Sequence, residues 1–217
     1  MLLVPLVLLY DVPAFATLSR DIAAIGRRFY ARHWVLGTSG NFSAVVRADP
    51  LRLAVTPSGA HKGKLSSSHL LEIDAQAKPV RGTRGTPSAE VALHLEIVRR
   101  RGAGAVLHTH SVWGTMLSDA HAGAGVLEIE GYEMLKGLSG VSTHEHREAI
   151  PVVRNDQDMT RLARAVGDML ERGPAVHAFL LQRHGLYTWG ATLAEAERHV
   201  EILEFLFETI AQTAARK

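Results

Sequence analysis

The chain has 217 residues, 47% of them hydrophobic, and its 24 lysines and arginines nearly balance its 22 aspartates and glutamates. This length and apolar content predict one α/β domain with a sizeable core, and the charge balance argues against a nucleic acid partner. The sequence pI near 9.1 would still suit a phosphorylated substrate. Cysteine is absent, which excludes disulfides and thiolate metal sites and is compatible with a cytoplasmic protein.

The chain begins with an apolar stretch of ten residues, Met-Leu-Leu-Val-Pro-Leu-Val-Leu-Leu-Tyr. No basic residue precedes this run, Pro5 interrupts it, and it is too short to span a bilayer, so neither a signal peptide nor a membrane anchor is favoured. We therefore expect residues 1–17 to form an apolar extension and residues 18–217 to form a single domain.

The rest of the chain alternates between helical and strand patterns. Helices are predicted where apolar residues recur at helical spacing or start signals occur: 18–33, 87–101, 111–117, 159–171 and a last helix after Thr192. Strands are predicted for short apolar runs bounded by turn residues: 42–46, 51–55, 105–110, 150–153 and 178–181, with 185–189 continuing the last strand. This mixture indicates the α/β class.

The segment 105–110 reads Ala-Val-Leu-His-Thr-His, an apolar strand that ends in two histidines. Side chains alternate along a strand, so His108 and His110 point to the same face, close enough to bind one ion. A catalytic zinc site usually has three protein ligands and one open position. The best third ligand is His184, which follows the apolar run 178–181. Histidine pairs of this kind also occur as ordinary surface or core residues, but the second strand favours a metal site.

Two loops of small polar residues precede these histidines, Gly37-Thr-Ser-Gly-Asn41 and Thr56-Pro-Ser-Gly59. Backbone N–H groups in such loops can hold an anion, and the lysines of residues 61–64 would add positive charge. Neither loop matches a nucleotide-binding fingerprint. Ordinary turn chemistry explains either loop alone, but near a metal site the two indicate a small phosphorylated substrate.

Two glutamates are candidates for acid–base chemistry. Glu90 lies in the first turn of a predicted helix, where it either complements the helix dipole or approaches the metal as a ligand or base. Glu133 lies in an acidic stretch with two glycines, where it is either solvated or placed for proton transfer at carbon. The pair His144-Glu-His146 is interpreted as surface loop, and His199 as a structural residue.

These motifs together resemble the class II aldolase/adducin family in their order and spacing, from about Leu18 to the end of the chain. The motifs that carry the resemblance are Gly37-Thr-Ser-Gly-Asn41, Thr56-Pro-Ser-Gly59, Pro87-Ser-Ala-Glu90, His108-Thr-His110 and His184-Gly185. The stretches most similar to a dehydratase branch of that family, which acts in methionine salvage, are 133–137, 184–190 and 204–207.

The resemblance implies a three-layer α/β/α sandwich around a mostly antiparallel sheet, in a single catalytic domain. It also implies one zinc ion per subunit held by His108, His110 and His184, and a homotetramer with sites near subunit interfaces. Glu133 matches the proposed acid/base of the dehydratases, and Glu90 matches the catalytic acid of the aldolases. The residues expected to bind the substrate phosphate are Thr38, Gly40, Asn41, Ser58, Gly59 and Ser88.

The implied activity is zinc-dependent dehydration of a phosphorylated ketose, with no nucleic acid or membrane partner. One alternative is a zinc aldolase that cleaves a sugar phosphate of the fuculose or rhamnulose type. Ala89 stands where aldolases commonly have a second serine, which weakens the match to their phosphate site. Another alternative is a non-catalytic interaction domain of the adducin kind. The metal stays open, since imidazole also binds iron, cobalt and manganese.

Overall fold

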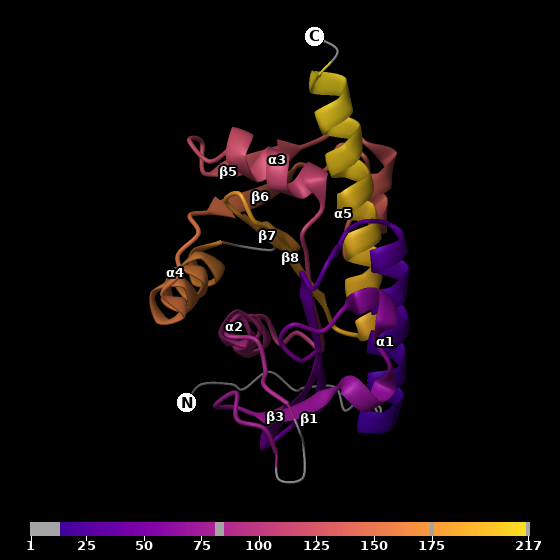
Figure 1. The fold of residues 1–217 in the computed structure, drawn as a ribbon. Helices are drawn as coiled ribbons and strands as arrows, with labels where there is room; N and C mark the ends of the chain where they lie inside the picture. Colours follow the sequence, from indigo (N-terminus) through magenta and orange to yellow (C-terminus); the bar gives the residue numbers. More distant parts are fainter. Residues whose placement is uncertain (1–13, 81–84, 174–175, 216–217) are drawn as a thin grey trace.

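The computed structural model describes residues 14–80, 85–173 and 176–215 (Figure 1). Helix α1 (Phe15–Ala31) begins three residues before the predicted helix, inside the region predicted to be an N-terminal extension. The remainder of that extension, residues 1–13, lies outside the described residues, so its separation from the domain stays a prediction. None of the helices in the described ranges is long and apolar enough to cross a membrane.

The described residues form one eight-stranded sheet, in the order β3-β2-β1-β4-β8-β7-β6-β5. Its strands are β1 (Asn41–Ala48), β2 (Leu51–Val55), β3 (Leu71–Asp74), β4 (Ala105–Thr109), β5 (Val126–Ile129), β6 (Glu148–Val153), β7 (Ala178–Leu181) and β8 (Gly185–Gly190). Neighbouring strands are antiparallel except for β6 and β7, which run parallel. The mostly antiparallel sheet is therefore confirmed.

Helices cover both faces of this sheet. On one face lie α2 (Val91–Arg101) and α4 (Met159–Arg172), and on the other lie α1, α3 (Val112–Ala120) and α5 (Leu193–Ala214) (Figure 1). One apolar core joins α2 and α4 to the sheet, and two further cores join α1, α3 and α5 to it. The predicted three-layer α/β/α sandwich is confirmed.

Strand β4 shows how the alternation of side chains places the histidines. Val106 packs in the core under α2, whereas Leu107 packs in the core on the α1 side. His108 therefore lies on the α2 face, where its ring stacks on that of its cross-strand neighbour Tyr187 at a centroid distance of 3.9 Å. Strand β4 therefore carries the His108 ring under α2.

The segment around His184 differs from the prediction. Strands β7 and β8 are antiparallel and separate, because the chain turns at residues 182–184 instead of continuing straight. A Cβ atom on Gly185 would lie 1.9 Å from the carbonyl oxygen of Thr109, so only glycine allows β8 to approach β4 this closely. The turn and this glycine together place His184 beside the end of β4.

Two helix starts can be compared with their predicted signals. Thr192 caps α5 as predicted, since its hydroxyl accepts from the backbone N–H of Glu195 at 3.1 Å. In contrast, α2 begins at Val91, four residues after the predicted start, because Pro87 forms an isolated bridge with Pro57 and residues 89–90 form a turn. Glu90 is consequently the residue just before α2.

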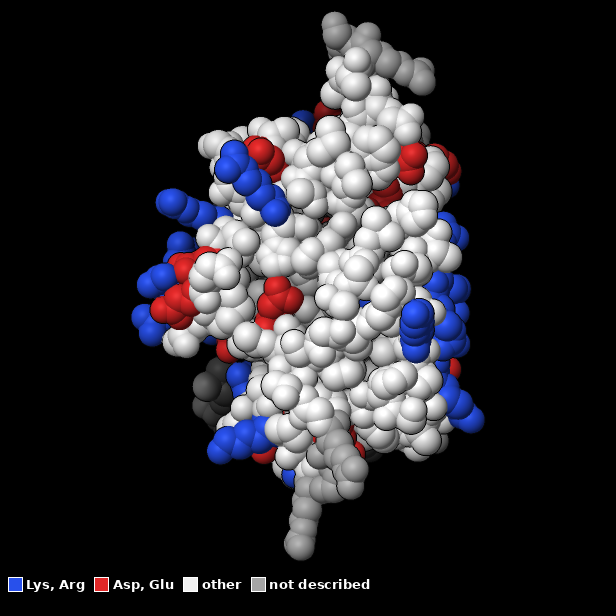
Figure 2. All heavy atoms as spheres, viewed as in Figure 1, with Lys and Arg blue, Asp and Glu red and all other residues white. Residues whose placement is uncertain are grey.

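Figure 2 shows lysine and arginine side chains gathered over α4 and along α1, with few of them in between. Several form ion pairs at the surface, such as Arg28 with Glu197, which joins α1 to α5. Exposed pairs of this kind contribute little to stability, so packing of the three layers holds the fold.

Candidate metal centre

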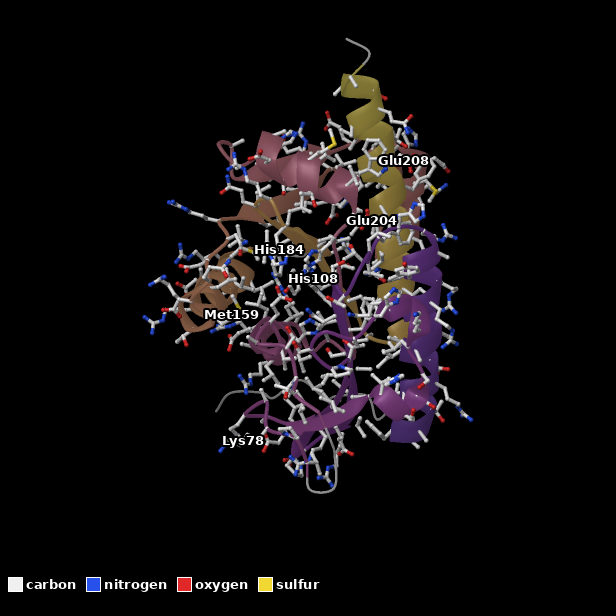
Figure 3. All side chains as sticks on the ribbon, in the orientation of Figure 1. Lys78, His108, Met159, His184, Glu204 and Glu208 are labelled. Carbon is white, nitrogen blue, oxygen red and sulfur yellow. The ribbon has the colours of Figure 1, made fainter. Side chains whose placement is uncertain are left out.

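Three imidazole rings converge at the end of β4. The Nε2 atoms of His108 and His110 lie 2.8 Å apart, and that of His184 lies 3.3 Å from the first and 3.1 Å from the second. With Zn–N bonds of about 2.0–2.1 Å, tetrahedral ligand nitrogens lie about 3.3–3.4 Å apart. The three rings therefore have nearly the spacing of metal ligands, and Figure 3 shows two of them, His108 and His184, side by side.

The protonation state of these rings also suits a metal. Nδ1 of His108 donates to the carbonyl oxygen of Leu186 at 2.8 Å, which leaves the Nε2 lone pair free for an ion. Burial, together with the neighbouring histidines, holds the pKa of His108 well below its usual range. Burial and the nearby His184 lower the pKa of His110 to about 4. Both rings are neutral at neutral pH, as a divalent metal requires.

Glu90 adds a carboxylate to this cluster. Its Oε1 atom lies 3.2 Å from Nε2 of His184, and its Oε2 atom lies 3.9 Å from Nε2 of His108. Burial alone would raise the pKa of Glu90, but the contacts with His184 and a hydrogen bond from Asn41 outweigh burial and lower it. The carboxylate is therefore ionised at neutral pH, where it can accept a proton or bind the cation.

A relay of buried hydrogen bonds orients Glu90. The hydroxyl of Ser43 donates to Nδ1 of His94 at 2.7 Å, and Nε2 of His94 donates to the amide oxygen of Asn41 at 2.5 Å. The amide nitrogen of Asn41 then donates to Oε2 of Glu90 at 2.5 Å. An amide oxygen can only accept, so Nε2 of His94 carries a hydrogen, and in the neutral ring Nδ1 accepts from Ser43. Burial supports this state by lowering the pKa of His94 to about 4.

The two loops predicted to bind phosphate are joined by one buried cation. The ammonium of Lys62 donates to the carbonyl oxygens of Thr38 at 3.1 Å and Ala60 at 2.9 Å. Burial lowers the pKa of Lys62 to about 8, and the nearby charge of Glu90 partly opposes this. Most of these side chains therefore carry a positive charge at neutral pH, between the loops and close to the metal centre.

A second set of contacts brings the loop at 56–59 to the start of α2. The backbone N–H of Ser58 donates to the carbonyl oxygen of Thr86 at 2.8 Å. The hydroxyl of Ser88 accepts from the backbone N–H of Glu90 at 3.3 Å. Ser58 and Ser88 thus lie on adjoining segments beside Glu90, as a shared substrate pocket would require.

Three other residues that were predicted to bind phosphate have different surroundings. Gly40 has a φ of +70°, and a Cβ atom there would lie 2.6 Å from the carbonyl oxygen of His108, so packing alone requires glycine. Asn41 is buried and already bonded to Glu90 on one side. At Gly59 a Cβ atom would meet nothing within 4 Å, so this backbone borders open space. Only Gly59 of these three is free for a ligand to approach.

Comparison with known proteins identifies this arrangement. Residues 20–211 match the family model of the class II aldolase and adducin N-terminal domain. The chain belongs to the class II aldolase/adducin family. A curated relative, the methylthioribulose-1-phosphate dehydratase of Methylococcus capsulatus, is 46% identical over 195 residues, which cover 89% of this chain and 93% of that protein. The enzyme of the same name from Marinobacter nauticus is 41% identical over 206 residues, covering 94% and 98%.

Solved structures share the fold of this family member. The YgbL protein of Klebsiella pneumoniae superposes with a TM-score of 0.77 and 25% identity, covering 94% of this chain and 93% of that one. The L-fuculose-1-phosphate aldolase of Thermus thermophilus gives a TM-score of 0.70 and 23% identity, covering 93% and 97%. The protein therefore has the class II aldolase fold.

The structure of this class II aldolase/adducin chain does not bring Glu133 to the histidines. Strand β5 ends at Ile129, opposite Glu148 at the start of β6, whereas His184 follows the end of β7. Because β6 and β7 run parallel, Ile129 and His184 lie at opposite ends of these strands. The Glu133 side chain is 72% exposed and contacts Lys136 at 2.6 Å. The predicted carboxylate beside the metal is therefore not Glu133 of the same chain.

The second histidine pair is only partly a surface loop. His144 is exposed, but Nε2 of His146 lies 2.8 Å from the carboxylate of Glu148, which is buried. His177 contacts the same carboxylate at 3.0 Å, so His146 lies in the predicted loop but is half-buried and pairs with a buried acid. His199 is buried and bonded to the backbone of β8, in agreement with its predicted structural role.

Three buried polar residues near the centre were not predicted as site residues. The sequence pattern marks Lys62 only as one of two loop lysines and gives His94 no role. His94 lies four residues after Glu90, a spacing that places both on one side of a helix and could have revealed it. Glu204 interrupts the apolar stripe of α5, and an acid at such a position is a recognisable signal.

Proposed function

We propose that this chain is a methylthioribulose-1-phosphate dehydratase, a hydro-lyase of methionine salvage. It would convert 5-methylthioribulose 1-phosphate into 2,3-diketo-5-methylthiopentyl 1-phosphate. The observation that carries the proposal is the similarity to curated enzymes of that name along nearly the whole chain, up to 46% identity. The cluster of three convergent histidines supports it by offering a place for the metal that such chemistry uses.

We assign one zinc ion per subunit to His108, His110 and His184. When bound, the ion would supply Lewis acidity to the C2 carbonyl of the substrate and make the hydrogen on C3 more acidic. The chain contributes neutral imidazoles, one of them locked by its bond to Leu186. Three protein ligands leave room for the substrate.

Dehydration removes the hydrogen from C3 and expels the hydroxyl of C4 as water, so a base and an acid are both needed. The enol formed between C3 and C4 then gains a proton at C4 and becomes the ketone at C3. Glu90 is ionised and borders the histidines, so it can hold a proton near the reacting carbons. The hydrogen bond that Asn41 donates keeps the Glu90 carboxylate in one orientation.

We assign the other proton transfer to Glu133 of a neighbouring subunit in a homotetramer. The 3-10 helix η3 (Glu133–Gly137) follows the end of β5, at the strand ends opposite to His184. The exposed apolar side chains of the chain include Met134 on η3, Val112 and Met116 on α3 and Phe205 on α5. Exposed apolar surface on adjacent elements is typical of subunit contacts. Such a contact would carry Glu133 to the histidines of the next subunit.

We assign the phosphate of the substrate to the loops that hold Thr38, Ser58, Gly59 and Ser88. The charge of Lys62, which bridges these loops, would attract the phosphate. Binding the phosphate there would fix C2, C3 and C4 relative to the metal centre and Glu90. The phosphate itself need not react, and the cysteine-free chain suits work in the reducing cytoplasm.

The test is to add 5-methylthioribulose 1-phosphate to metal-loaded protein and follow ultraviolet absorbance of the diketone and its enol. Dihydroxyacetone phosphate and aldehyde are measured in parallel. Dehydration without cleavage products, abolished by a chelator, would support the proposal. Cleavage products would instead establish an aldolase, and the absence of both reactions would reject this substrate.

A further inference from the structure

Glu204 is a carboxyl group buried in the apolar layer between α5 and the sheet. It is 1% exposed, and its neighbours Leu203 and Phe207 belong to the apolar core. Figure 3 labels it on α5, one turn before Glu208. Burying an acid is unfavourable unless its oxygens are paired, yet Oε2 of Glu204 has no hydrogen-bond partner. Such a residue in a packed core calls for a specific reason.

Glu204 is hydrogen-bonded to a residue that lies next to His110 in the chain. Its Oε1 atom accepts a hydrogen bond from the hydroxyl of Thr109 at 2.6 Å. Burial raises the pKa of Glu204 to about 7, and the nearby hydroxyls of Ser111 and Thr109 oppose this rise. Ser111 also caps α3, because its Oγ atom accepts from the backbone N–H of Gly114 at 2.9 Å. The Glu204 carboxyl group therefore holds Thr109, the residue immediately before His110.

His110 depends on such contacts, since β4 ends at Thr109 and the sheet ladder does not extend to it. Its backbone N–H donates to the carbonyl oxygen of Trp34 at 2.7 Å. Alternation along the strand places the Thr109 side chain on the face opposite the histidines, towards α5. Glu204 thus lies behind the metal centre and fixes His110 from the other side of the strand.

We propose that Glu204 is a positioning residue that orients the His110 imidazole towards the metal through Thr109. It touches neither substrate nor ion. The role rests on the proposed metal centre but not on the identity of the substrate. A hydrophobic side chain of similar size would fill the same space in the core, but it would leave the Thr109 hydroxyl without its acceptor.

The experiment compares Glu204→Leu, Glu204→Gln and a matched control, Glu208→Gln, on the exposed side of the same helix. Zinc affinity is measured on the full chain by competition with a chromophoric chelator, and ligand geometry is read from the d–d spectrum of the Co²⁺-loaded protein. Loss of such an outer partner typically weakens metal binding about 10- to 100-fold. We expect this loss and an altered cobalt spectrum in Glu204→Leu, near-normal values in Glu204→Gln, which keeps an acceptor, and no change in the control.

A folded Glu204→Leu variant with the zinc affinity and cobalt spectrum of the natural chain would overturn the proposal. If that variant does not fold, Thr109→Val removes the same hydrogen bond from the other partner, and unchanged metal binding there would overturn it equally. A natural chain that binds neither zinc nor cobalt would reject the proposal together with the metal centre. A natural chain that binds zinc but does not dehydrate the substrate would reject only the proposed function.

Discussion

The side-chain amide of Asn41, the first residue of β1, donates a 2.5 Å hydrogen bond to the carboxylate of Glu90, the residue before α2. Its amide oxygen accepts from His94 at the same distance. Asn41, which was expected to contact the phosphate, instead links the start of α2 to the metal centre. The orientation of Glu90 therefore depends on a buried histidine that is not among the three convergent rings.

Asn41→Ala should lower turnover about 10- to 100-fold, as loss of an outer partner typically does. It should also destabilise the fold by about 1–3 kcal/mol, because the buried N–H of His94 loses its acceptor. Turnover at saturating substrate and chemical unfolding test the two effects. Unchanged turnover in folded Asn41→Ala would show that Glu90 needs no such support.

His184→Ala should lose metal while the sheet stays folded, because it removes one of three ligands from the end of the β7–β8 turn. Metal analysis of the purified variant after dialysis tests this, with the exposed His144→Ala as a matched control. Full metal occupancy in His184→Ala would show that another residue is the third ligand.

Glu133→Gln and His184→Ala should each be inactive alone, yet regain activity when co-expressed. In a mixed tetramer, the intact Glu133 of one subunit can face the intact histidines of another. Random assortment would restore up to about a quarter of the sites. Turnover of the mixed protein after tandem affinity purification measures this. A mixture as inactive as its components would mean that Glu133 does not act across a subunit contact.

Gly185→Ala should disrupt the protein, because the added methyl would lie 1.9 Å from the carbonyl oxygen of Thr109. Overpacking against backbone should cost about 3 kcal/mol or more and displace His184. Gly123→Ala is the control, since nothing lies within 4 Å of its added methyl. Unfolding midpoints and zinc content are compared. Equal stability of the two variants would contradict the close approach of β8 to β4.

The pair of Glu148 and His177 should make stability depend on pH. Burial would raise the pKa of Glu148, but hydrogen bonds from His177 and His146 lower it overall. Burial would lower the pKa of His177, but Glu148 raises it overall. The contribution of Glu148 is lost as pH falls through its lowered pKa, and that of His177 is lost as pH rises through its raised pKa.

Both contributions are therefore complete between the ordinary values of these groups, near pH 4.5 and 6.5. Glu148→Ala should remove this dependence and cost about 3–5 kcal/mol, since it leaves a buried partner unpaired. Unfolding free energies of the natural chain and of Glu148→Ala, measured at pH 5.5 and pH 8.5, test this prediction. If Glu148→Ala lowered the unfolding free energy more at pH 8.5 than at pH 5.5, the assignment would be contradicted.

The metal centre was predictable because its signal is local. An apolar run that ends in histidine occurs twice, and β4 and β8 bring the two ends together, as the antiparallel pairing of His108 with Tyr187 shows. Strands β3 and β5 were not predicted, because acidic residues interrupt their apolar runs, whereas the equally short β7 is wholly apolar.

The place of Glu133 could not be predicted from its sequence neighbourhood. It depends on strand order, since β5 lies at the sheet edge beyond β6 and β7. The roles of His94 and Glu204 were not predicted for a related reason. Each residue lies in a helix whose apolar pattern predicts core packing. Only the tertiary structure shows that both bond to residues next to the metal ligands.

The measurement that tests the central claim most directly is turnover of 5-methylthioribulose 1-phosphate by metal-free protein titrated with zinc. If dehydration takes place at the three-histidine centre, diketone formation should be absent without metal and should rise until one zinc is bound per subunit. His184→Ala should stay inactive throughout the titration. Full dehydration by protein free of metal, or the same response in His184→Ala, would contradict the account.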